Sequence, residues 1–116
     1  MAGTLNIVSS SITTNSGSKI IGPFSVSSAS PIGQIIDLTF NAAVTLSFVC
    51  PAGATCAVIS PPAASAVPLT LKGASGDTGV GLSPSQPSVI SLGTTPVTLY
   101  LNASAAITGV VEVSFF

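Results

Sequence analysis

Apolar and polar side chains alternate with a period of two along most of this 116-residue chain, and this pattern constrains the fold more than any other feature. The apolar members of the clearest runs are Ile36, Leu38 and Phe40; Val44, Leu46 and Phe48; Val97, Leu99 and Leu101; and Val111, Val113 and Phe115. Successive side chains of a β-strand point to opposite faces, so such alternation indicates strands with one face on a core. No segment of about ten residues shows the period of an amphipathic helix. The sequence therefore predicts an all-β fold.

The expected strands are short, and turn-forming glycine, proline, serine and asparagine residues separate them. They lie near residues 4–14, 20–28, 34–40, 44–49, 56–60, 67–72, 88–92 and 97–102, with a further candidate at 107–116. This spacing predicts a single β-sandwich domain over residues 1–116, with about eight to nine short strands. Because alternation does not encode strand order, a jelly-roll-like and an immunoglobulin-like sandwich both fit the pattern.

Charged residues are scarce in this chain. They make up 4% of it, against about a quarter of a typical soluble domain. The charged residues are Lys19, Lys72, Asp37, Asp77 and Glu112. Two cations cannot neutralise the several phosphates that give affinity for nucleic acid, which argues against DNA or RNA as a partner. With no histidine and few acids, the chain is not expected to be an enzyme, and no catalytic residue, cofactor or metal site is expected.

We find no targeting or membrane signal in the sequence. The first residues lack the basic segment and the apolar run of a signal peptide. Prolines interrupt the uncharged stretch between Asp37 and Lys72 well short of a membrane span. We therefore expect synthesis in a cytoplasm and no membrane partner.

The two cysteines, Cys50 and Cys56, bracket a short segment that contains proline and glycine. Such a segment can close a small disulfide loop. It can equally be a turn beside two half-buried free thiols, because cytoplasmic proteins seldom carry disulfides. A zinc site is the least favoured alternative, since no second ligand pair accompanies the cysteines.

The segment Asp77-Thr78-Gly79 matches the signature of aspartic proteases. That chemistry needs two carboxylates that share a proton, so a chain with one copy of the signature would have to dimerise. The glycine-rich residues before Asp77 indicate a solvated loop, and aspartate followed by threonine and glycine is also an ordinary turn. A turn is the favoured interpretation, and a dimeric protease using Asp77 is a remote alternative.

The low charge suggests a surface that other protein covers. Soluble monomers avoid association by carrying net charge and by guarding strand edges with lysine or proline. This chain has a net charge of −1 and only two lysines to guard its strand edges, so we expect it to associate.

The aromatic residues are Tyr100 and five phenylalanines, which look like core members. The last two, Phe115 and Phe116, point to opposite faces if they lie on a strand. One of them can enter the core, and the other lies under a loop or in a contact between subunits. Phe115 and Phe116 are therefore the candidate interface residues.

Part of the chain resembles small β-structured bacteriophage virion proteins of the capsid decoration or accessory kind. The resemblance rests on Leu71-Lys72-Gly73, Gly76-Asp77-Thr78-Gly79-Val80, the segment from Pro87 to Gly93 and the ending from Ile107 to Phe116, and it covers about the last 45 residues. It implies a structural role in a virion, through contacts with its own copies, as in a trimer, and with a larger protein shell. It implies no particular binding residue. The expected location is the virion, after synthesis in the host cytoplasm.

One further class of function fits the same sequence. A glycan- or receptor-binding module of a fibre or surface layer is also rich in β-structure. Such a module is expected to present exposed aromatic rings with polar partners, and one tyrosine without any tryptophan is a thin supply.

Overall fold

The computed structural model describes residues 3–7, 10–14, 17–21, 24–28 and 35–116. These residues form twelve β-strands and no helix, which confirms the all-β prediction. The strands are β1 (Gly3–Ile7), β2 (Ser10–Thr14), β3 (Gly17–Ile21), β4 (Phe24–Ser28), β5 (Ile35–Leu38), β6 (Val44–Cys50), β7 (Cys56–Ser60), β8 (Leu69–Lys72), β9 (Val80–Leu82), β10 (Ser88–Ser91), β11 (Val97–Ala103) and β12 (Val111–Phe115).

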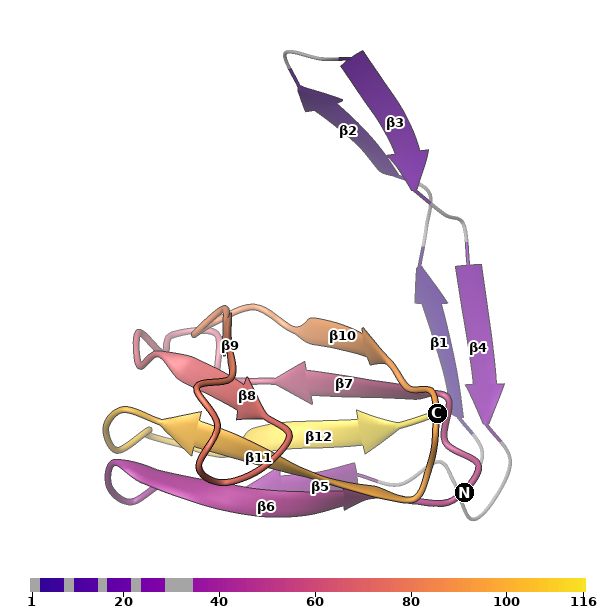
Figure 1. The fold of residues 1–116 in the computed structure, drawn as a ribbon. Coiled ribbons are helices and arrows are strands. Elements are labelled where there is room, and N and C mark those ends of the chain that lie inside the picture. Colours follow the sequence, from indigo (N-terminus) through magenta and orange to yellow (C-terminus); the bar gives the residue numbers. More distant parts are fainter. Residues whose placement is uncertain (1–2, 8–9, 15–16, 22–23, 29–34) are drawn as a thin grey trace.

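The eight strands β5 to β12 form two four-stranded antiparallel sheets. Sheet I has the order β10-β7-β12-β5, and sheet II has the order β6-β11-β8-β9. The two sheets lie face to face as the layers of a sandwich (Figure 1). The predicted β-sandwich is therefore confirmed.

Strand order distinguishes the two topologies that the sequence left open. The strands form nested antiparallel pairs, β5 with β12, β6 with β11, β7 with β10 and β8 with β9. Successive pairs lie alternately in sheet I and sheet II. Eight strands wound in this way make a jelly roll. Only the innermost pair, β8 with β9, is adjacent in the chain, so most of the pairing is long-range.

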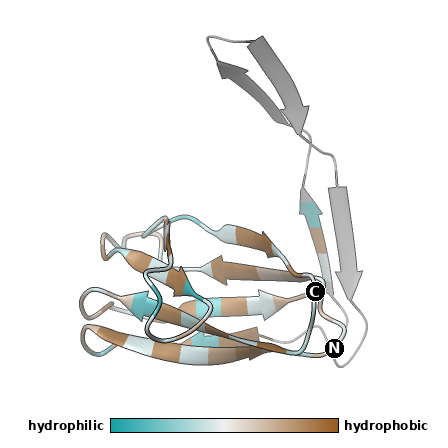
Figure 2. Ribbon diagram, viewed as in Figure 1, coloured by the Kyte–Doolittle hydropathy of each residue, from teal (hydrophilic) through white to brown (hydrophobic). Residues whose placement is uncertain are grey.

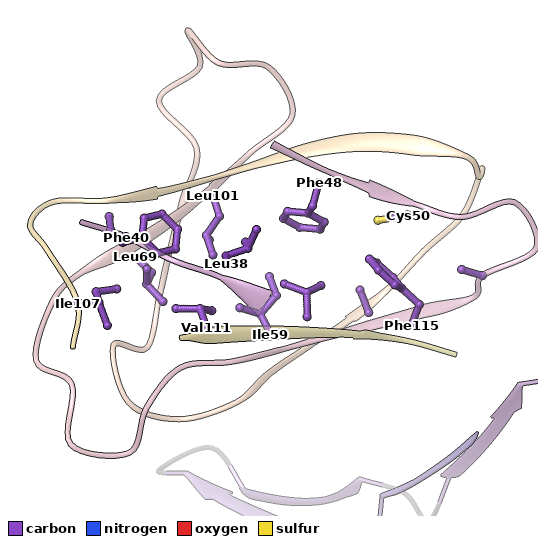
Figure 3. Packing of buried hydrophobic residues seen from close by; sticks show 14 residues of the cluster. Leu38, Phe40, Phe48, Cys50, Ile59, Leu69, Leu101, Ile107, Val111 and Phe115 are labelled. Atoms are coloured by element: carbon purple, nitrogen blue, oxygen red, sulfur yellow. The ribbon is translucent and has the colours of Figure 1, made fainter. Parts of the chain in front are cut away.

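The core lies between the sheets and is made by the alternating residues that the sequence indicates. The largest fully buried side chains of this core are Phe40, Phe115, Ile59, Leu69, Leu101, Val111, Val113 and Cys50, whereas Cys56 is equally buried but lies outside the core cluster. Most of the labelled core residues point toward one another between the two layers (Figure 3). The rings of Phe48 and Phe115 meet across the sandwich with centroids 6.3 Å apart. Full burial of one such side chain contributes about 1.5–3 kcal/mol.

The first four strands lie outside the sandwich sheets. β1 pairs with β4 and β2 pairs with β3, each as a two-stranded antiparallel ribbon. Figure 1 shows these ribbons extending away from the sandwich. The single strands expected near residues 4–14 and 20–28 are thus each two strands in the structure. One domain over residues 1–116 stays a prediction.

A further difference is β9, because the sequence predicted no strand between residues 72 and 88. Its three residues pair with β8 through Leu69, Thr70 and Leu71. Gly79, just before β9, has a φ of 79°, and a Cβ atom there would lie 2.5 Å from the carbonyl oxygen of Leu71. Close approach of the two backbones therefore requires glycine at this position.

Candidate functional site

The cysteines do not form a disulfide in this structure. Both are free and both are buried. Cys50 ends β6 and lies in the core cluster with Phe48 (Figure 3). Cys56 begins β7, where Ala57 and Ile59 belong to the core cluster, so Cys56 lies on the outer side of sheet I. The alternative of two thiols beside a turn is the one that the structure adopts, and both thiols are more buried than expected.

Burial has a chemical consequence for these thiols. It raises the pKa of Cys50 and of Cys56 above the ordinary value, because desolvation disfavours the charged thiolate. A thiol that stays protonated is a poor nucleophile and a poor metal ligand. Among the described residues, no group of three or more His, Cys, Asp or Glu side chains is placed to hold a metal ion.

Asp77 lies in an exposed turn between β8 and β9. Its Oδ2 accepts a hydrogen bond of 2.9 Å from the backbone N–H of Ala74, and its own N–H donates to the carbonyl oxygen of Ala74 at 3.1 Å. An aspartate that closes its own turn in this way has a local structural role. A protease dyad instead needs two closely apposed carboxylates that share a proton. The geometry of Asp77 does not favour the protease alternative.

The two terminal phenylalanines point to opposite faces, as expected for a strand. Phe115 is a core residue with 1% of its surface exposed, so it has no side-chain surface to offer to another subunit. Phe116 is half-buried. Its backbone exchanges hydrogen bonds with Cys56 in both directions, at 2.9 and 3.0 Å. Directly opposed residues share a face of the sheet, so Phe116 lies with Cys56 on the outer side of sheet I.

The outer face of sheet I carries two of the few acidic residues. Asp37 in β5 and Glu112 in β12 are directly opposite each other in the antiparallel register, and both are exposed. Ser60 of β7 lies opposite Glu112 on its other side. Like charges directly opposite each other destabilise a sheet, whereas favourable cross-strand pairs stabilise it by about 0.2–1 kcal/mol.

The outer face of sheet II carries Tyr100, and the prediction that this residue belongs to the core was wrong. Leu99 and Leu101 face inward on β11, so Tyr100 between them faces outward, where it is half-buried. Ser47 of β6 and Lys72 of β8 lie directly opposite it on either side. This face is thus largely polar, with one aromatic ring and the exposed Val49 at its β6 edge.

A side-chain hydrogen bond crosses the same face between β11 and β6. Nδ2 of Asn102 donates to Oγ1 of Thr45 at 3.0 Å and to the carbonyl oxygen of Val44 at 3.3 Å. These bonds tie the edge strand β6 to β11 over an exposed part of the sheet.

Exposed apolar side chains gather at the edges of the sandwich. The strands at the edges are β5 and β10 in sheet I and β6 and β9 in sheet II. Among the residues whose burial the structure describes, five of the exposed large apolar residues lie on these four strands, and the sixth, Val110, immediately precedes β12. The five are Ile35, Val44, Val49, Val80 and Val89. The sequence predicts an association surface but not its position on the edges, because only the strand order identifies which strands are edges.

The edges differ in how they are guarded against pairing. β5 carries Asp37, β9 has only three residues, and β10 has four residues that follow Pro87. Charge, shortness and proline are the usual devices that block an edge. β6 has seven residues from Val44 to Cys50, with no charge, no proline and no glycine. Figure 2 accordingly draws β6 in brown and near-white.

A small hollow lies between the loops that follow β7 and β11. Its volume is about 270 Å³, and it is lined by Pro62, Ala64, Ser65, Ala66, Val67, Ala106, Ile107 and Thr108. Oγ of Ser65 already accepts a hydrogen bond from the N–H of Val67. Ligand pockets are usually about 300–1,000 Å³ and have several convergent polar groups, so this hollow offers little to a ligand.

In the part of the chain that the structure describes, no helix has the length and apolar character needed to cross a membrane. Comparison with models of protein families, with curated proteins and with solved structures finds no match to this chain.

Proposed function

We propose that this protein is a non-enzymatic structural component of a virus or bacteriophage particle, of the capsid decoration, stabilisation or accessory kind. It acts through contacts with its own copies and with a larger protein shell. The observation that carries the proposal is the gathering of exposed apolar residues on the edge strands of a jelly roll with almost no charge.

Two physical considerations support this function. Jelly rolls occur in viral capsid domains, and a fold of this kind is suited to tight packing between subunits. Fold alone does not assign function, so the surface is the stronger support. Ile35 and Val80 expose 60% and 65% of their surfaces on strand edges, where an isolated monomer would be prone to associate. A particle gives such edges a permanent partner.

Electron microscopy of the native source material tests the proposal. An antibody against the folded protein, carried on gold, is expected to label particles at regularly repeated positions. A fraction of purified particles that contains none of this protein, with all of the protein recovered elsewhere in the material, would contradict the proposal.

A second candidate function is favoured by the position of Tyr100. Its ring is on the outer face of sheet II with the hydroxyl of Ser47 and the ammonium group of Lys72 on either side, which are groups that can bind a sugar. Binding to a glycan array that is lost in Tyr100→Ala and retained in Tyr100→Phe would favour a glycan-binding module. No binding by the wild-type protein would leave the particle as the better proposal.

A further inference from the structure

We propose that the β1–β4 ribbon of one copy pairs with the free edge of β6 in a second copy and extends sheet II across the subunit boundary. The proposal rests on the subunit contacts of the proposed function and names the segments that make them. It would hold for any assembly of this chain, whether or not the assembly is a virion.

The acceptor in this pairing is β6. It is the longest of the four edge strands, and β11 occupies only one of its two sides. Seven residues present an edge of about 23 Å at the usual rise of a strand. Val49 exposes 53% and Val44 38% of their surfaces there. A long, flat and uncharged edge is a template for a strand of another chain.

The donor is the β1–β4 ribbon. Each of its strands has five residues, and the two are in register over all five, from Gly3 opposite Ser28 to Ile7 opposite Phe24. An isolated two-stranded ribbon is marginally stable in water, whereas three or more strands can persist. A third strand from a neighbouring copy would supply what this ribbon lacks.

Charge distinguishes this ribbon from the β2–β3 ribbon. β1 and β4 contain no charged residue and no proline. β3 contains Lys19, and lysine is a common guard of an edge. The uncharged ribbon is therefore the one that we assign to β6, whose edge is also uncharged.

The pairing is expected between copies and not within one chain. In the described residues, β1 and β4 pair only with each other, and sheet II ends at β6. Figure 1 shows the ribbons extending away from the sandwich, as an arm that reaches a neighbour would. A contact between two different surfaces of the same chain forms a ring if the rotation closes, and a trimer is one such ring.

Hydrogen exchange of the full-length protein, measured over a range of concentrations with the molar mass determined in parallel, tests the pairing. As the mass rises, amides of β1 or β4 and of β6 are expected to gain protection together. The variant Val44→Lys/Val49→Lys places two cations on the β6 edge. It is expected to raise the concentration needed for association about tenfold or more.

The matched control is Gln86→Lys/Ser104→Lys, which places the same two charges at exposed loop positions outside the edge strands. It is expected to associate as the wild type does. Thermal melting shows whether each variant is folded. If the double β6 variant melts early, the single Val49→Lys variant takes its place, because Val49 faces outward and is half exposed.

Three outcomes would overturn the proposal. Protection that appears in β6 but not in the ribbon would show that two β6 strands pair with each other. Equal loss of association in the β6 variant and its control would show that charge in general, and not this edge, governs assembly. A monomer at every concentration would exclude the pairing. The proposed function would then be tested separately, by the labelling of particles in the electron microscope.

Discussion

The sandwich and the β1–β4 ribbon are made of the same short, uncharged kinds of strand, yet they differ in what each strand has beside it. In the sandwich, the inner faces of both sheets share one core, and the central strands β7, β12, β11 and β8 each have two neighbours. In the ribbon, β1 and β4 each have one neighbour among the described residues. Alternation is enough to make a strand, but the number of neighbours decides whether the strand is stable. We therefore expect the sandwich to hold itself together and the ribbon to gain stability from association.

The largest effect is expected from a large-to-small substitution in the core of the sandwich. Phe40 is fully buried, so Phe40→Ala should lower the free energy of unfolding by about 3–5 kcal/mol through lost burial and a residual cavity. Denaturant unfolding followed by circular dichroism measures this change. Val80→Ala on the exposed edge is the control and should change stability by less than about 0.5 kcal/mol. Equal effects of the two substitutions would contradict the assigned core.

A break in the ribbon should separate association from stability. Leu5 in β1 lies opposite Val26 in β4, and Leu5→Pro removes a backbone N–H that would bond either β4 or the strand added by a second copy. We expect the variant to lose concentration-dependent association, while the unfolding of the sandwich changes by less than about 0.5 kcal/mol. Sedimentation velocity and denaturant unfolding of the same samples check both halves. A large loss of sandwich stability would show that the two regions are not independent.

The buried thiols predict how the stability of the sandwich depends on pH. Burial raises the pKa of Cys50 and Cys56 in the folded protein, so the thiols ionise first in the unfolded chain. Stability should therefore be complete below the ordinary thiol pKa of about 8.5 and should fall as the pH rises above it.

Denaturant unfolding between neutral and alkaline pH measures this effect. The variant Cys50→Ala/Cys56→Ala is the control, because it keeps the other groups that titrate in alkali. The decline in stability should be smaller in this variant. An identical decline in both proteins would show that the thiols do not contribute.

The smallest effect is expected on the outer face of sheet I. Asp37→Asn removes one of two opposed carboxylates and should raise the free energy of unfolding by about 0.2–1 kcal/mol. The gain should shrink as salt is added, because salt screens exposed charges. Asp77→Asn, which weakens the acceptor of a turn instead, should give no gain. A loss of stability in Asp37→Asn would mean that its carboxylate has a favourable partner.

The all-β class and much of the core could be predicted from the sequence, because alternation fixes which side chains share a face. Tyr100 was assigned wrongly although the same rule applied, since Leu99 and Leu101 already took the inner face of β11. Cys56 was harder, because apolar residues occupy both faces of β7 from Cys56 to Ile59 and leave no alternation to read.

The jelly-roll order and the unguarded edge could not be predicted from the sequence. β5 and β12 pair although most of the sandwich lies between them in the chain, and local patterns carry no information about such partners. The edge position of β6 follows only from that strand order. The absence of charged residues from β6 therefore indicates an unguarded edge only when the order of sheet II is known.

The central claim is that the exposed strand edges of this protein bind other protein subunits. Sedimentation velocity of the wild-type protein over a wide range of concentrations tests this claim most directly. We predict that the monomer gives way to a discrete oligomer as the concentration rises. Val44→Lys/Val49→Lys should prevent this change, whereas Gln86→Lys/Ser104→Lys should not. A single monomeric species at every concentration, for the wild type as for the variants, would contradict the claim.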